Sequence, residues 1–153
     1  MQADAELRAS WRARWLAAIR EIADLGEQRG AWLNPDADNS HHSFVECMCC
    51  YFDDLSLDGE DSYRIRLEEG LLTINEVAAV SPLHAMLLAY SAPAGDDYDH
   101  EAILSDPAWW AVAAEAKRTI ERLRDLLREP EEVRTLLRPS VEGLRARQNQ
   151  GTA

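Results

Sequence analysis

The sequence predicts a single compact all-α domain of five or six helices, and three observations support this fold class. Apolar residues recur at steps of three and four in most segments, which is the spacing of a helix with one buried face. Capping residues and prolines precede several of these segments. The chain has 153 residues, 46% of them hydrophobic, so it can bury a core without disulfides or a metal. We place the helical domain at residues 1–144 and expect a disordered tail at residues 145–153.

The first expected helix lies near the N-terminus. An apolar stripe runs along it and comprises Leu7, Trp11, Trp15, Ala18, Ile19, Ile22 and Leu25. Gly26 and Gly30 are expected to end this helix, because glycine favours helix C-termini. The segment 32–40 contains an Asn-Pro pair and several Asp and Asn residues, which is typical of a loop.

The next helix is expected to begin after Ser43. Ser43 and Glu46 have the spacing of a capping box, in which each side chain accepts a bond from the other residue's backbone amide. The Asp-Gly pair at 58–59 is expected to end the run. The apolar face of this helix comprises Phe44, Met48, Tyr51, Phe52 and Leu55.

Residues 63–72 fit two local structures. Tyr63, Ile65 and Leu67 alternate with charged residues, which favours a short strand or hairpin. The leucine pair at the end of the segment fits a turn into the next helix equally well. The sequence leaves both structures open.

Three or four further helices are expected in the second half of the chain. Thr73 and Glu76 form a second capping-box pattern. The helix that they open meets Pro82, which either breaks it or begins a new helix. The Asp-Pro pair at 106–107 begins the longest helix, and Pro130 begins a short last one.

Residues 41–54, HHSFVECMCCYFDD, hold two histidines and three cysteines and raise the question of a metal or redox site. Cys47 and Cys50 have a spacing found in zinc sites, but the chain contains no second pair to complete four ligands. In a helix the three thiols point in different directions, and the acidic neighbours of Cys50 raise its pKa. We therefore expect structural cysteines and no cofactor. The alternative is a metal-binding helical protein, with ligands from carboxylates and from Cys47, Cys50, His42 and His84.

The sequence shows no catalytic motif, and we predict that the protein is not an enzyme. No serine has the flanking glycines of a hydrolase nucleophile, and the seven glycines form no phosphate-binding loop. No acidic segment has the spacing of a calcium loop. The chain has neither a secretory signal nor an apolar run long enough to cross a membrane, which predicts a cytoplasmic location.

The clearest functional signal is the distribution of charge. The net charge is −12 at pH 7, yet residues 31–106 contain sixteen acidic residues and two arginines, for −14. The segments on either side are close to neutral. Such an acidic block repels nucleic acid phosphates and anionic lipids, and it attracts a cationic partner. An acidic surface that only keeps the protein soluble is the alternative explanation.

These observations lead to the hypothesis of a small acidic interaction protein that binds a basic protein, with neither nucleic acid nor membrane as a partner. In size, acidity and expected location the chain is similar to bacterial immunity proteins and antitoxins that block basic toxins. The other interpretation is a helical domain without catalytic activity, as a monomer or homodimer. Acidic residues beside loops, with tyrosines as anchors, are the expected contacts. The candidate partner-binding residues are Asp53, Asp54, Asp58, Glu60, Asp61, Tyr63, Asp96, Asp97, Tyr98 and Asp99.

Overall fold

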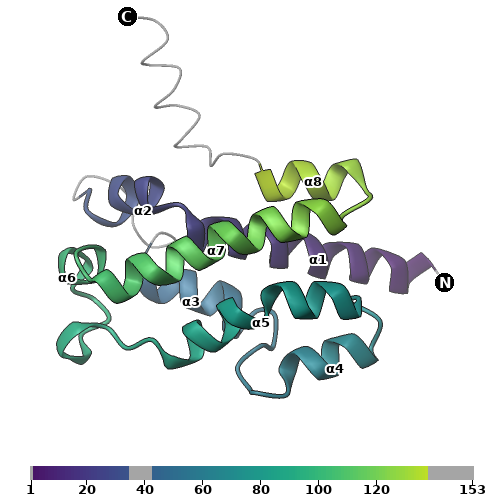
Figure 1. Cartoon of the computed structure of the whole chain (residues 1–153), viewed down its shortest axis with the longest axis horizontal. Coiled ribbons are helices and arrows are strands. Elements are labelled where there is room, and N and C mark those ends of the chain that lie inside the picture. Colours follow the sequence, from purple (N-terminus) through teal and green to yellow (C-terminus); the bar gives the residue numbers. More distant parts are fainter. Residues whose placement is uncertain (1, 35–42, 138–153) are drawn as a thin grey trace, which may run out of the picture.

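Eight α-helices and one short 3₁₀ turn make up the described parts of the chain, residues 2–34 and 43–137 of a computed structural model (Figure 1). No strand occurs in these residues, so the predicted all-α class is confirmed. The helices outnumber the five or six expected because three short helices were not anticipated, namely α2, α4 and α6. The elements are α1 (Gln2–Ala23), α2 (Leu25–Trp32), α3 (Phe44–Phe52), α4 (Ser62–Glu68), α5 (Ile74–Ala89), η2 (Pro93–Gly95), α6 (His100–Leu104), α7 (Pro107–Leu126) and α8 (Pro130–Leu137).

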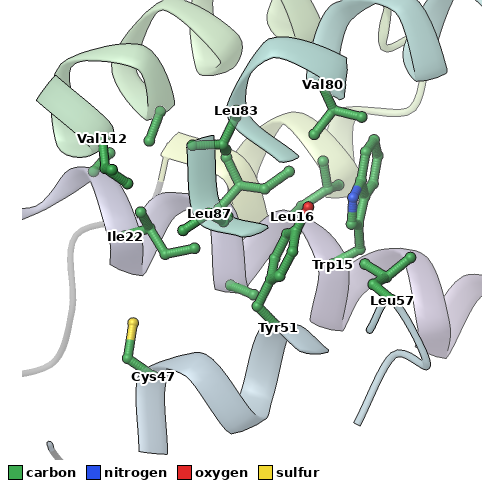
Figure 2. Close-up of a cluster of buried hydrophobic side chains, with 14 of the residues drawn as sticks. Trp15, Leu16, Ile22, Cys47, Tyr51, Leu57, Val80, Leu83, Leu87 and Val112 are labelled. Atoms are coloured by element: carbon green, nitrogen blue, oxygen red, sulfur yellow. The ribbon is translucent and has the colours of Figure 1, made fainter. Parts of the chain in front are cut away.

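The two long helices α1 and α7 run through the middle of the molecule, and the shorter helices surround them (Figure 1). α7 packs against both α1 and α5, while α1 also contacts α3 and α8. The core lies between these helices. Figure 2 shows Trp15 and Leu16 of α1 meeting Tyr51 of α3 and Leu83 of α5, and all four side chains are fully buried.

The predicted apolar stripe of α1 is buried only in the second half of the helix. Trp15, Ile19 and Ile22 are fully buried, whereas Leu7 is 69% exposed, because the first turns of α1 extend past most of the neighbouring helices (Figure 1). The prediction that glycines end this helix was wrong. α1 ends at Ala23, and the carboxylate of Asp24 accepts a bond from the Glu27 amide, which starts α2 one residue later.

The cap predicted for α3 is confirmed. The Ser43 hydroxyl accepts a bond of 3.0 Å from the Glu46 amide. The prediction that the Asp-Gly pair at 58–59 ends this helix was wrong, because α3 ends at Phe52. Phe44 and Tyr51 on its apolar face are buried, as the spacing predicted.

Of the two structures left open for residues 63–72, the strand or hairpin was wrong, since Ser62–Glu68 form the helix α4. Tyr63 is buried on its inner side, whereas Arg64 is exposed and pairs with Glu68 one turn later at 2.9 Å. The alternating pattern was misleading because a lone strand needs a partner strand, and none is present in the described residues.

Helix α5 runs through Pro82 without a break, so the proline neither ends the helix nor begins a new one. A proline has no amide hydrogen, and its ring disturbs the carbonyls of the preceding turn. Two side chains bond to carbonyls in this turn: the Ser81 hydroxyl donates to the Val77 carbonyl at 2.6 Å, and Arg122 of α7 donates to the Ala79 carbonyl at 3.2 Å. The neighbouring helix α7 therefore contacts the backbone of α5 just before Pro82.

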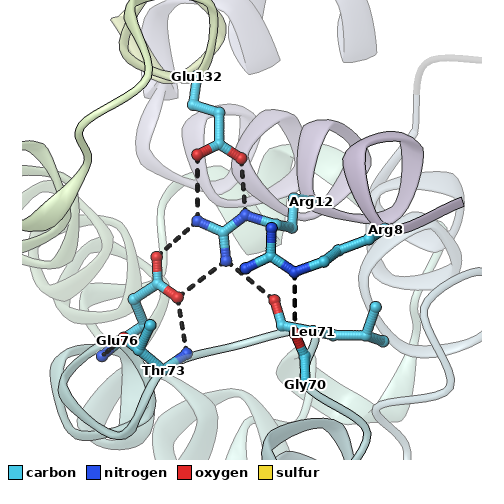
Figure 3. Close-up of polar contacts among 7 residues, drawn as sticks. All are labelled: Arg8, Arg12, Gly70, Leu71, Thr73, Glu76 and Glu132. Carbon is cyan, nitrogen blue, oxygen red and sulfur yellow. Dashed lines mark hydrogen bonds and ion pairs between the residues drawn. The ribbon is translucent and has the colours of Figure 1, made fainter. Parts of the chain in front are cut away.

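A buried arginine ties three helices together (Figure 3). The guanidinium of Arg12 on α1 donates two bonds to Glu76 at the start of α5, at 2.8 and 2.6 Å. It also donates to Glu132 of α8 at 2.6 and 3.2 Å, and to the Leu71 carbonyl at 2.9 Å. Glu76 completes the predicted capping box by accepting from the Thr73 amide at 2.8 Å. This network links α1, α5 and α8 through one side chain.

The last two helices begin as predicted. The Asp106 carboxylate accepts a bond from the Ala108 amide at the start of α7, and Pro130 is the first residue of α8. The predicted domain limit at residue 144 and the tail 145–153 lie outside the described residues.

Candidate functional site

Nine of the ten candidate partner-binding residues are exposed, and they lie in two separate parts of the chain. One group follows α3 and includes Asp53, Asp54, Asp58, Glu60 and Asp61. The other lies between η2 and α6 and includes Asp96, Asp97, Tyr98 and Asp99.

Tyr63 is the exception, and its prediction as an exposed anchor was wrong. Its side chain is only 4% exposed, and its hydroxyl bonds to Trp15 and Tyr51 in the core. Tyr98 is 76% exposed and is therefore the one of the two candidate tyrosines that a partner can reach.

The structure brings Asp53 and Asp97 together, although they belong to the two different segments. Both line one open groove of about 270 Å³ between α3 and the end of α5. The other side chains of this groove are mainly apolar or aromatic: Phe44, Val45, Met48, Cys49, Phe52, Leu87 and Tyr90. We call this the acidic-rimmed groove.

The floor of the acidic-rimmed groove is held by aromatic contacts below it. The ring centre of Phe44 lies 5.4 Å from that of Trp109 and 5.8 Å from that of Tyr90, in edge-to-face geometry. The Tyr90 hydroxyl donates a bond of 3.0 Å to Asp106. Partial burial and this carboxylate both raise the pKa of Tyr90, so its hydroxyl stays protonated and its position is fixed.

The rim segment 96–99 is ordered by its own side chains. Asp96 accepts a bond of 2.9 Å from the Tyr98 amide, and Asp99 caps α6 by accepting from the Ala102 amide at 3.1 Å. These two carboxylates therefore stabilise the backbone conformation of segment 96–99. Asp97, between them, lines the groove.

The remaining acidic candidates do not join this groove. Glu60 lines a second groove of about 560 Å³ beside α5, together with Tyr63, His84 and Leu88. Asp54 lines a third cavity with Cys50 and two arginines of α1. Asp53 and Asp97 thus line one groove, whereas the candidates as a whole do not converge on a single site.

A chain of buried hydrogen bonds was not anticipated from the sequence. The Trp15 indole donates to the Tyr63 hydroxyl at 2.9 Å, and the hydroxyls of Tyr63 and Tyr51 lie 2.7 Å apart. The Tyr51 hydroxyl lies 2.9 Å from Nδ1 of His84, whose Nε2 lies 3.3 Å from the Gly59 carbonyl. Its members are far apart in sequence, so no local pattern could reveal it.

The direction of this chain follows from its two ends. An indole N–H of Trp15 only donates, and a carbonyl of Gly59 only accepts. All bonds are satisfied when Tyr63 donates to Tyr51, Tyr51 donates to Nδ1 of His84, and the ring donates through Nε2. His84 is therefore neutral, and burial lowers its pKa, with the Gly59 bond opposing this shift.

The three cysteines are free thiols with raised pKa values. Burial raises the pKa of Cys47 well above its usual value, and burial followed by Glu21 and Asp54 raises that of Cys50 to about 11. The predicted direction for Cys50 is therefore confirmed, although burial contributes more than charge. Reactive thiolates need the opposite shift.

The metal-binding alternative gains no support from the part of the chain that the structure describes. No group of three or more His, Cys, Asp or Glu side chains converges there. The predicted ligand His42 and its neighbour His41 lie outside the described residues.

Comparison with known proteins found no matching family model, curated protein or solved structure. Among the described residues, no helix combines the length and apolar character needed to cross a membrane.

Proposed function

We propose that this protein is an interaction protein that binds a basic protein partner through its acidic surface. The observation that carries the proposal is the acidic-rimmed groove, where Asp53 and Asp97 flank an apolar floor. An apolar centre with a charged rim is the usual anatomy of a protein-binding surface. The charge of −14 between residues 31 and 106 adds a long-range attraction for cations.

The exposed acidic residues of the two segments support a salt-sensitive association. Asp53, Asp54 and Asp58 are exposed, as are the acidic residues of segment 96–99. Exposed charges of one sign speed the encounter with an oppositely charged partner more than they strengthen the final complex. A partner with a basic surface, such as a nuclease toxin, is the class that such a surface fits. We extend the proposal to an inhibitor of the immunity-protein or antitoxin type.

The titratable groups below the surface support binding rather than catalysis. Both ring nitrogens of His84 have partners within the chain of hydrogen bonds, and the thiols of Cys47 and Cys50 have raised pKa values. A general base needs a free lone pair within reach of a substrate, and a nucleophilic thiol needs a lowered pKa.

The test is binding to basic proteins encoded beside this chain, measured by isothermal titration calorimetry at low and high salt. The Asp53→Asn/Asp97→Asn variant is expected to weaken binding. A matched control is Glu121→Gln/Asp125→Asn, which removes the same charge from exposed positions on α7.

Lysine substitutions at Asp96, Asp97 and Asp99 give a stronger form of the test. If binding is unchanged by these lysines and by the Asp53 and Asp97 substitutions, the acidic surface is not the binding site and the proposal fails. Folding of each variant is checked by circular dichroism, because Asp96 and Asp99 also order their own segment.

A further inference from the structure

We propose that the acidic-rimmed groove binds an arginine side chain of the basic partner. The inference rests on the proposed function and specifies the chemistry of the anchor. Its starting point is the unusual combination within one groove of two carboxylates, from Asp53 and Asp97, with the half-buried rings of Phe52 and Tyr90. A groove that bound only charge would not need an aromatic floor.

The parts of an arginine side chain match the parts of the groove. Its aliphatic stem can cover the apolar surface of Val45, Met48 and Leu87 while its charged end stays near water. The guanidinium is planar, so one face can lie on an aromatic ring while its edge donates to carboxylates. Asp53 and Asp97 supply acceptors at the rim.

The same features favour arginine over lysine. An ammonium group is strongly hydrated and compact, whereas a guanidinium is weakly hydrated and stacks on aromatic faces. Entry into a partly apolar groove removes water, which costs the lysine more. The groove therefore distinguishes two side chains of equal charge.

The size of the groove favours a single side chain as the occupant. Its volume of about 270 Å³ lies just below the range of about 300–1,000 Å³ typical of small-molecule sites. Its walls are also fixed before binding, since Phe44 packs against Trp109 and Tyr90 bonds to Asp106. A preformed groove loses less entropy when it accepts an anchor.

The experiment compares hexa-arginine with hexalysine as probes of equal charge. Binding to the full chain is measured by calorimetry at low salt, and the methyl signal of Met48 is followed by NMR to locate the probe. Hexa-arginine is expected to bind about two- to fivefold more tightly than hexalysine and to shift the Met48 signal. Asp53→Asn/Asp97→Asn is expected to weaken hexa-arginine binding roughly tenfold and to remove the preference.

Two variants separate the anchor from general charge attraction. Phe52→Leu keeps both carboxylates and is expected to lose the arginine preference, while Glu121→Gln/Asp125→Asn is expected to keep it. Equal binding of the two probes, with sensitivity to the Asp53 and Asp97 substitutions, would overturn the arginine site and leave the acidic surface as the binding site. If Asp53→Asn/Asp97→Asn and Glu121→Gln/Asp125→Asn weaken hexa-arginine binding equally, both proposals are overturned.

Discussion

Replacing the buried arginine at the centre of the polar network tests how the bundle is held together. Arg12→Met removes all five hydrogen bonds of the guanidinium, including the pair to Glu76 on α5 and the pair to Glu132 on α8. The side chains of Arg12 and Glu76 are 5% and 4% exposed, so the substitution leaves a buried carboxylate without its cation.

The expected loss of stability follows from this burial. Breaking a buried ion pair by removing one partner costs about 3–5 kcal/mol. A domain has only about 5–15 kcal/mol of unfolding free energy, so Arg12→Met removes a large share of it. For a chain of this length the midpoint of thermal unfolding is expected to fall by roughly 6–20 °C. Urea unfolding followed by circular dichroism measures the change in free energy directly.

The pH dependence of the variant separates the ion pair from a simple loss of packing. Burial by itself raises the pKa of Glu76, but the bonds from Arg12 and Thr73 lower it overall. In the natural chain the contribution of Glu76 to stability is therefore present above its ordinary pKa of 4.5, and it is lost as pH falls through the lowered folded value. Without Arg12 the buried carboxylate gains from protonation, so the deficit is expected to shrink as pH falls toward 5.

Arg8→Ala is the control, because Arg8 lies one turn earlier, is exposed and donates one bond to the Gly70 carbonyl. It is expected to cost no more than about 1 kcal/mol. A loss below about 1 kcal/mol for Arg12→Met, or a deficit independent of pH, would refute the reasoning.

Two further predictions concern helix α5. The pKa of His84, read from an NMR titration of its ring protons, is expected to lie below its ordinary value of 6.5. Because a lowered folded pKa makes the unfolded chain bind the proton first, the His84 contribution to stability is constant above pH 6.5 and falls as pH drops toward the folded value. A pKa at or above 6.5 would contradict the neutral chain of hydrogen bonds. Pro82→Ala is expected to raise the unfolding free energy, measured by urea unfolding, by on the order of 1 kcal/mol, since alanine restores the missing helical amide. A destabilised variant would show that the proline ring itself is needed.

Local patterns predicted the helices whose start and buried face are encoded within a few residues. The N-cap at Ser43, the capping box at Thr73 and the Asp-Pro pair at 106–107 placed three helix starts correctly. The errors occurred where a tertiary contact decides between local alternatives. Residues 62–68 are helical with Tyr63 buried against the core, and α5 continues past Pro82 at a place where Arg122 of another helix bonds to its backbone.

The candidate site could be predicted from the sequence only as a set of exposed acids. Burial of Tyr63 could not be anticipated, because its hydroxyl partners Trp15 and Tyr51 come from two other helices. The pairing of Asp53 with Asp97 could not be anticipated either, since it depends on how the end of α5 lies beside α3. Charge patterns identify which side chains are available, and packing decides which of them share a groove.

The acidic segments are held in place by the core rather than extending freely from it. Asp53 and Asp54 directly follow α3, and both of their backbone amides donate to the Cys49 carbonyl, at 2.9 and 3.0 Å. Gly59, beside Glu60, is bonded to the buried His84. Like charges brought close together repel, so an acidic surface of this kind costs folding free energy that the buried contacts must offset. Because the carboxylates are positioned before a partner arrives, less ordering entropy is lost on binding, which is an advantage of rigid anchoring for an interaction surface.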